Sequence, residues 1–342
     1  MINTESISNC PACGYQGEIA LEECRDRICK LPGNWYFRRC QYCSSLWLDP
    51  RPSRNSIPSL YPEQYTFTHK QPSSPLQEPQ GGLKRLAFAA KLAILERQFG
   101  YLELSKRTQS GLSKHVGKLA SMLPGFSRKA GYTVRFLGYR PEGKLLEVGV
   151  GNGNFSILMK ELGWQVEGIE PDPQAAKIAQ SSGVKVMEGA IEDVNLSASS
   201  YDAIVIHHVI EHIPDPKAVL AKLINSLKPG GILVSIAPNP VGMIAQIFGK
   251  NWYGLDAPRH LVLPSPRGYQ HMLKKLDCKV NVSTSMQTAF WMFRASLRLQ
   301  QNQRAGWYVD KVMPILFSWL SSLLLVFFPK RGEEVICIVN KN

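Results

Sequence analysis

Apolar and polar residues follow two different periods along the second half of the chain. Short apolar runs typical of buried strands alternate with segments in which apolar residues recur every three or four positions, as in helices. The expected strands are 144–148, 165–169, 185–188, 203–207, 232–236, 279–283 and, near the end, 334–339. The expected helices are 155–162, 173–181, 216–227 and 267–276. This alternation predicts an α/β fold with a doubly wound, mainly parallel sheet of seven strands.

An insertion at 286–332 separates the last two expected strands, and its centre is strongly apolar. Residues 312–328 contain 13 apolar side chains in 17 positions. A membrane-crossing helix needs about 20 apolar residues, and a crossing would leave the final strand on the wrong side of the membrane. We therefore expect a buried or dimer-forming helix, with a helix lying in a membrane interface as the alternative.

Six of the eight cysteines lie near the N-terminus, before residue 44. Two CxxC motifs are formed by Cys10, Cys13, Cys40 and Cys43. Four thiolates from two such turns can close a tetrahedron around a zinc ion, which then has a structural role. We expect a zinc-ribbon-like module over 1–50. Cys24 and Cys29 are expected to be buried or free thiols, with metal ligation as the alternative.

The segments between this module and the main domain differ in composition. Residues 51–82 are rich in Pro, Ser and Gln and are expected to form a linker. Residues 83–140 have helical spacing, including a second amphipathic stretch at 112–123. The remaining domain, 141–342, contains the predicted sheet.

Positive charge is concentrated in the helical segment. The chain has a formal net charge of +13, of which 83–140 contributes +10, from 12 Lys and Arg against 2 Asp and Glu. We expect a solvated face packed on the main domain. A surface that meets an anionic substrate or a lipid membrane is the alternative.

The N-terminal residues bear on location. Residues 1–6 have neither the basic nor the apolar region of a secretory signal. In a reducing compartment, clustered cysteines favour metal ions over disulfides. We expect a cytoplasmic protein, and peripheral contact with the inner face of the membrane through 83–140 and 312–328 remains open. The sequence does not determine the oligomeric state.

A glycine-rich stretch at 145–155 lies between an expected strand and an expected helix. Gly149, Gly151 and Gly153 follow Glu147. Glycine permits positive φ and close approach of a ligand, and the next helix offers free N–H groups. A dinucleotide fingerprint needs G-x-G-x-x-G, and the third glycine is missing in either register. An acid at the end of the strand favours a ligand with a cationic group.

This stretch resembles the first motif of the class I S-adenosylmethionine-dependent methyltransferases, which have a Rossmann-like fold. The resemblance covers 144–285 and the last strand. Its further motifs are 167–172, 188–193 and 201–212, the last with a Glu211–His212 pair. Capping of the following helix by Glu211 and His212 is an alternative reading of that pair.

The resemblance implies a role for each cofactor-site residue. The glycine loop would pass under the methionine and ribose parts of S-adenosylmethionine, with Glu147 holding the amino group. Glu170 would accept both ribose hydroxyls. Ile191 would pack on the adenine ring, Glu192 would bind the adenine amino group, and His207 would line the site.

A second resemblance is to a bacterial branch that joins a CxxC…CxxC module to this fold and modifies sugars, surface glycans or natural products. Besides the cysteines, it is carried by 48–52, 61–62 and 251–261. In zinc-containing sugar C-methyltransferases the matching loop has a His-Glu-His run whose last His acts as base, and His260 matches that His. Arg259 replaces the Glu and favours contact with a phosphate or carboxylate of the substrate. Tyr253 is a second substrate-binding candidate.

Together these features predict methyl transfer to a C, O or N atom of an acceptor. The expected acceptor is a small molecule or glycan, such as an anionic sugar, nucleotide sugar or lipid-linked saccharide. His260 is the favoured base and His212 the second, because imidazole titrates near neutrality. A packing or capping role is the alternative for His260.

Two other functions were weighed against methyl transfer. One is a zinc-ribbon nucleic-acid-binding protein with a non-catalytic Rossmann-like domain. The basic segment supports it, but few aromatic residues are interleaved there for base stacking. The other is a nicotinamide-dependent oxidoreductase, which the missing glycine disfavours.

Overall fold

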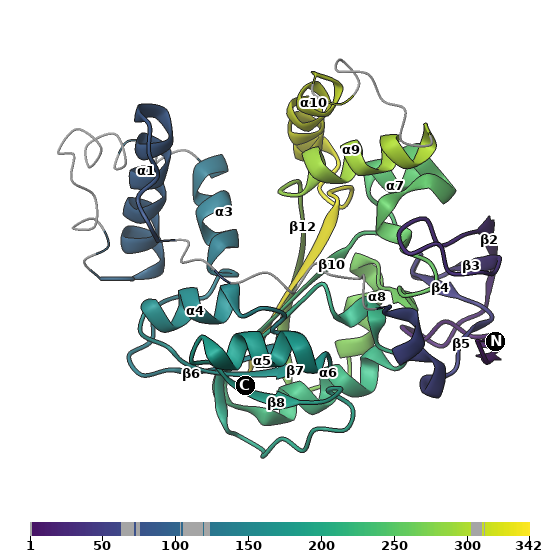
Figure 1. Ribbon diagram of the computed structural model, residues 1–342, viewed down its shortest axis with the longest axis horizontal. Helices are drawn as coiled ribbons and strands as arrows, with labels where there is room; N and C mark the ends of the chain where they lie inside the picture. The colour runs from purple at the N-terminus through teal and green to yellow at the C-terminus, as the bar shows by residue number, and fades with distance from the viewer. Residues whose placement is uncertain are drawn as a thin grey trace. The chain divides into compact units, whose positions relative to one another are not determined.

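The seven expected strands pair into one sheet in the order β12–β13–β10–β9–β6–β7–β8. Their bounds are β6 Lys144–Val148, β7 Gln165–Glu170, β8 Lys185–Glu188, β9 Tyr201–His207, β10 Leu227–Pro238, β12 Cys278–Ser285 and β13 Glu334–Lys341. Figure 1 labels several of these strands and the helices between them. Strands β6, β7 and β8 are parallel, whereas β13 runs antiparallel to both β10 and β12. The predicted Rossmann-like α/β fold with a mainly parallel sheet is therefore confirmed.

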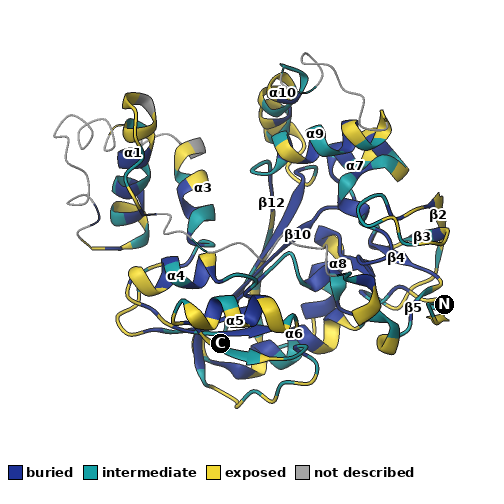
Figure 2. Ribbon diagram, in the orientation of Figure 1, coloured by how far each residue is buried: buried dark blue, intermediate teal, exposed yellow. Residues whose placement is uncertain are grey.

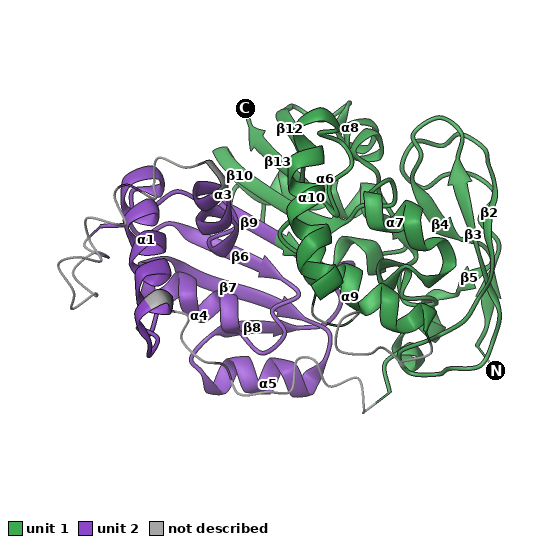
Figure 3. Cartoon of the chain, turned by 90° about the horizontal axis from the view of Figure 1, so that it is seen from above, with its two compact units in different colours: residues 1–67, 196–199, 206–342 green, residues 68–195, 200–205 purple. Residues whose placement is uncertain are grey.

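The chain is described in two units. The computed structural model describes residues 2–62, 72, 76–102, 104, 119, 124–301, 310 and 312–342. Unit 1 consists of 1–67, 196–199 and 206–342, and unit 2 consists of 68–195 and 200–205 (Figure 3). The cysteine module belongs to unit 1, and the glycine loop belongs to unit 2.

Unit 2 contains the parallel strands β6, β7 and β8. Among its described residues, α1 Gly82–Phe99 and α3 Pro124–Thr133 precede these strands, and α4 Asn154–Glu161 and α5 Pro173–Ser181 follow β6 and β7. The start of α5 follows from its sequence, because the Asp172 side chain accepts hydrogen bonds from the N–H groups of Gln174 and Ala175. Val148 pairs with Ile169 and Glu170 with Glu188, so the carboxyl ends of the strands meet at one edge. The expected stretch 112–123 lies outside the described residues, apart from position 119.

In unit 1, the cysteine module forms a four-stranded antiparallel sheet in the order β11–β4–β3–β2. Its strands are β2 Gly17–Cys24, β3 Trp35–Cys40, β4 Leu46–Leu48 and β11 Val262–Leu263, beside a separate pair of β1 Thr4–Glu5 and β5 Arg51–Pro52. Strand β11 comes from a segment distant in sequence and pairs with Trp47 and Leu46 of β4. The sheet of the module is therefore completed by the 251–263 region.

The helices of unit 1 connect its strands or belong to the insertion. They are η1 Arg54–Leu60, η3 Ile210–His212, α6 Pro216–Ser226, α7 Met243–Phe248, η4 Gly249–Asn251, η5 Tyr253–Leu255, α8 Pro266–Leu273, α9 Ala289–Gln300 and α10 Met313–Phe327. Part of the expected linker is thus ordered as η1, whereas 63–71 and 73–75 lie outside the described residues.

Helix α10 contradicts the expectation of a buried helix within this chain. Phe317 stacks on Phe293 of α9, with ring centroids 4.3 Å apart. However, Trp319 is 74% exposed and Val326 77% exposed, and Figure 2 shows exposed residues along the helix. Across the described part of the chain, no helix has the length and apolarity needed to span a membrane. Dimer formation and interfacial contact therefore stay as predictions.

Candidate functional site

The glycine loop of unit 2 has the backbone conformation that its sequence predicts. Gly149, Gly151 and Gly153 all have positive φ, at 79°, 56° and 87°. A side chain at Gly153 would also press on Ala179, because its Cβ would lie 3.2 Å from the Cβ of that residue. The N–H of Gly149 donates to the carbonyl of Ile169, which ties the loop to the end of β7. The positive φ therefore requires glycine at all three positions, and Gly153 also has no room for a side chain.

Glu147, at the end of β6, is a buried carboxyl group below this loop. Its Oε2 accepts a hydrogen bond from the hydroxyl of Ser156 at 2.5 Å. Burial raises the pKa of Glu147 to about 7, and the Ser156 hydrogen bond and the charge of Arg135 only partly offset this rise. A cationic group bound here would stabilise the ionised carboxylate.

Glu170, at the end of β7, holds the glycine loop through its side chain. One carboxylate oxygen accepts from the N–H of Gly151 at 2.7 Å, and the other accepts from the N–H of Asp172 at 3.0 Å. Burial raises its pKa despite these two hydrogen bonds. The carboxylate therefore lies against the loop, where the sequence predicts contact with ribose.

The remaining predicted cofactor residues lie at two places. The loop that contains buried Ile191 and half-buried Glu192 is joined to β7, because the N–H of Gly189 donates to the carbonyl of Glu170. Unit 2 thus brings these residues to the edge of the sheet that carries Glu147 and Glu170. His207 belongs to unit 1, where its ring packs against His208. The contacts of all these residues with a cofactor stay predictions.

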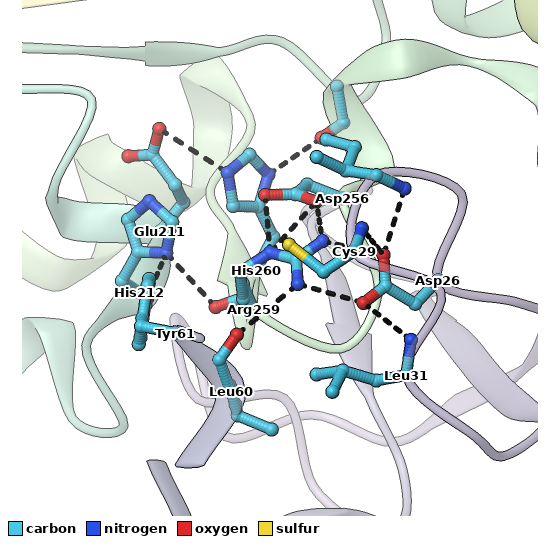
Figure 4. Close-up of polar contacts among 12 residues, drawn as sticks. Asp26, Cys29, Leu31, Leu60, Tyr61, Glu211, His212, Asp256, Arg259 and His260 are labelled. Atoms are coloured by element: carbon cyan, nitrogen blue, oxygen red, sulfur yellow. Dashed lines mark hydrogen bonds and ion pairs between the residues drawn. The ribbon is translucent and has the colours of Figure 1, made fainter. Parts of the chain in front are cut away.

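In unit 1, His212 and His260 face each other in a buried polar cluster (Figure 4). His212 comes from η3, and His260 comes from the loop that precedes β11. Nδ1 of His212 lies 3.1 Å from the carbonyl oxygen of Arg259, and Nδ1 of His260 lies 2.8 Å from that of Gly254. Because a carbonyl can only accept, a proton on each Nδ1 satisfies these contacts, and Nε2 of the neutral ring then has a free lone pair. The two predicted bases therefore lie together.

Glu211 is the acid of the cluster, and sequence reasoning had treated it only as part of the Glu-His pair. Burial opposes its ionisation, but the hydrogen bond from His208 and the nearby histidines outweigh burial and lower its pKa to about 2. Burial likewise opposes protonation of His208, yet Glu211 and Glu334 raise its pKa to about 10. His208 bridges them at 3.4 Å and 3.1 Å. Desolvation, together with His260, lowers the pKa of His212 to about 4, which favours its neutral form.

Arg259 does not have the surroundings expected of a substrate-binding residue. Its side chain is fully buried, and its guanidinium pairs with Asp26 at 2.8 Å and with Asp256 at 2.5 Å. Burial would lower its pKa, but these two carboxylates raise it. The predicted contact with an anionic substrate is replaced by two internal ion pairs, which join the 256–260 loop to the cysteine module. Asp26 had no sequence signal that could have identified this role.

Tyr253 and Tyr61 flank the same region. The N–H of Tyr253 donates to the hydroxyl of Ser296, and burial raises the pKa of the Tyr253 phenol. Its substrate contact stays a prediction. The hydroxyl of Tyr61 lies 3.0 Å from Nδ1 of His212 and was missed as a site residue. In the sequence, the only signal for Tyr61 was its place in the 61–62 motif of the second resemblance.

The four cysteines of the CxxC motifs converge as the sequence predicts. Sγ of Cys13 lies 3.4 Å from the sulfurs of Cys40 and Cys43, and Sγ of Cys10 lies 3.6 Å from that of Cys43. Thiolates at the zinc–sulfur distance of about 2.3 Å would have similar spacing. The hydrogen bond from Cys10 lowers the pKa of Cys43 to about 5, whereas hydrogen bonding to Cys43 and burial raise the pKa of Cys10. The donor set fits structural zinc, and the ion itself stays a prediction.

The two other N-terminal cysteines lie outside this four-cysteine group. Cys24 is buried, and burial raises its pKa to about 11, whereas Cys29 is half-buried. Both environments favour the neutral thiol over the thiolate that a metal requires. They match the buried or free thiols expected.

Comparison with known proteins relates the segment that contains the glycine loop to a family. Residues 125–283 match the family model described as a methyltransferase domain. A ubiquinone biosynthesis O-methyltransferase of Xanthomonas axonopodis pv. citri is 32% identical over 166 residues, covering 46% of this chain and 63% of the relative. The corresponding enzyme of Bordetella avium is 31% identical over 140 residues, covering 38% and 56%. The chain thus spans less than two thirds of these relatives.

Among solved structures, a methyltransferase from Archaeoglobus fulgidus that depends on S-adenosylmethionine is similar, at 20% identity and a TM-score of 0.44. The match covers 63% of this chain and 92% of that one. The family match, the seven-stranded sheet and the glycine loop fall in the same part of the chain. Residues 125–283 are therefore similar to a methyltransferase domain.

Proposed function

We propose that the chain transfers a methyl group from S-adenosylmethionine to a hydroxyl oxygen of a small-molecule acceptor. The observation that carries the proposal is the pair of buried carboxylates, Glu147 and Glu170, beside a positive-φ glycine loop in a segment that matches a methyltransferase domain. Oxygen is preferred as the acceptor atom because the relatives are named as O-methyltransferases.

The cofactor supplies a methyl group already activated on sulfonium, so the protein mainly binds and aligns. Glu170 has lone pairs beyond those used by Gly151 and Asp172 and can accept two ribose hydroxyls. Glu147, with its raised pKa, suits the cationic amino group of the methionine part. Ile191 and Glu192 would contact adenine.

Deprotonation of the acceptor is assigned to His260, with His212 as the second candidate. The free lone pair on Nε2 of His260 supports a base role. Replacing His260 by Ala should lower kcat while cofactor binding is retained. Unchanged turnover of His260→Ala with intact cofactor binding would remove it from the reaction.

Cofactor binding is tested by calorimetry with S-adenosylhomocysteine. We expect binding to wild-type protein, and weakening by about tenfold or more in Glu170→Gln, because charged hydrogen bonds to ribose are lost. Glu142→Gln is the matched control, since Glu142 is exposed and precedes β6 at the opposite end of the strand. Absence of binding, or equal weakening in both variants, would refute the assignment.

The acceptor is tested with methyl-labelled S-adenosylmethionine and two substrate panels. Hydroxylated aromatic compounds related to ubiquinone precursors represent the chemistry named for the relatives. Nucleotide sugars and lipid-linked saccharides represent the acceptor predicted from the sequence, which the relatives do not support. Label recovered on a hydroxyl oxygen supports the proposal, whereas label on carbon or nitrogen contradicts it.

A further inference from the structure

Three hydrogen-bond acceptors converge in unit 1 without a donor among them. They are one ring nitrogen each of His212 and His260 and a carboxylate oxygen of Glu211, and these three atoms lie within 4.8 Å of one another (Figure 4). Nδ1 of each histidine lies at hydrogen-bond distance from a backbone carbonyl, and Nδ1 of His212 also lies near the Tyr61 hydroxyl, so a proton on Nδ1 leaves Nε2 for a ligand. Oε2 of Glu211 is buried and has no hydrogen-bond partner. Buried acceptors that face one another need a cation or a donor to offset their desolvation.

We propose that Glu211, His212 and His260 bind a divalent first-row transition-metal cation. Two imidazoles and one carboxylate form a mixed nitrogen and oxygen donor set, which such cations accept. Oε1 of Glu211 lies 4.0 Å from Nε2 of His260. Ligands at about 2.1 Å from a metal would be somewhat closer together, so the three side chains draw inwards when the ion binds. Three protein ligands leave coordination positions for water or a ligand oxygen.

The surrounding contacts support ligation. The carbonyls of Arg259 and Gly254 fix the orientation of the two rings, and an N–H contact of this kind is typical of metal-bound histidine. His208 holds Glu211 through a hydrogen bond at 3.4 Å. His212 is half-buried and His260 keeps a small exposed area, so solvent reaches part of the cluster.

Metal binding at these lone pairs competes with the base role assigned to His260. A ring that coordinates a cation through Nε2 cannot accept a proton there, so an acceptor hydroxyl would instead be acidified by the metal. The inference does not depend on the methyl-transfer proposal, because it rests on unit 1 and its test measures metal binding alone.

The experiment uses the full chain with one equivalent of zinc, titrated with Mn²⁺ and followed by the electron paramagnetic resonance signal of free Mn²⁺. We expect one Mn²⁺ bound per chain. His260→Gln and His212→Gln should each weaken binding by about tenfold or more. Glu211→Gln should also weaken Mn²⁺ binding. If the Glu211→Gln protein does not fold, the two histidine variants still test the proposal.

Two control variants locate the ion. His271→Gln changes a histidine whose ring lies against Tyr42, and should bind Mn²⁺ like the wild type. His207→Gln tests the other described histidine group, His207, His208 and Glu334. The proposal fails if wild-type protein binds no Mn²⁺. It also fails if His207→Gln abolishes binding while His260→Gln retains it.

Discussion

At the residue scale, burial decides what a charged side chain does. Arg259 has the chemistry of an anion-binding residue, and its place beside His260 in the sequence favoured a substrate role. In the structure its charge is neutralised by Asp26 and Asp256. Asp26 is itself fixed by the N–H groups of the following loop. Arg259 therefore positions the loop that carries His260.

Replacing Arg259 by Met should lower the free energy of unfolding by about 3–5 kcal/mol, because two carboxylates would lose a buried partner. Urea denaturation measures this change. The same replacement should cost much less in a background of Asp26→Asn and Asp256→Asn. If Arg259→Met had unchanged stability but a raised KM for the acceptor, the result would favour substrate binding by Arg259 over an internal ion pair.

Glu147 should give the protein a pH-dependent stability. Its pKa is about 7 in the folded chain, against an ordinary value of 4.5. Between these values the unfolded chain binds fewer protons, so unfolding free energy falls as pH rises, by up to about 3 kcal/mol. Glu147→Gln should lack this contribution. Urea denaturation at pH 5 and pH 8 tests it, and equal pH dependence in both proteins would contradict it.

At the element scale, the periodicity of apolar residues located the strands of the sheet and most of the helices between them. The predicted 144–148, 173–181 and 185–188 agree with β6, α5 and β8 at both ends. The apolar composition of 312–328 correctly predicted a helix but not its environment. Composition measures how apolar a helix is, whereas burial depends on what packs against it.

The exposed face of α10 should contribute little to folding. Replacing exposed Leu316 and Leu323 together by Gln should change unfolding free energy by only about 0.5 kcal/mol. The double replacement should reduce any membrane binding or self-association through the exposed face of α10. Flotation with anionic vesicles measures membrane contact, and sedimentation velocity measures self-association. A large loss of stability, or unchanged association in both assays, would contradict a surface role.

At the scale of the whole molecule, the cysteine module is part of unit 1 through contacts distant in sequence. Val262 and Leu263 complete its sheet. The hydroxyl of Ser265 donates to the carbonyl of Cys43. These contacts couple the expected zinc site to the region that follows His260.

Loss of zinc should therefore disturb two distant stretches. In Cys43→Ala, we expect loss of one zinc per chain, a lower melting temperature, and faster hydrogen exchange at both 10–43 and 260–268. Cys24→Ala is the matched control and should retain zinc, since Cys24 lies outside the four-cysteine group. Zinc loss with unchanged exchange at 260–268 would contradict the coupling.

Local sequence patterns were enough to predict several features of this protein. Strand and helix periodicity predicted the sheet, three glycines predicted the positive-φ loop, and two CxxC motifs predicted the convergence of four thiols. The ion pairs of Arg259, the addition of β11 to the module, and the meeting of Glu211, His212 and His260 emerged from the folded chain alone. These depend on residues distant in sequence, where burial and proximity set the charge and the available lone pairs, and no local pattern encodes them.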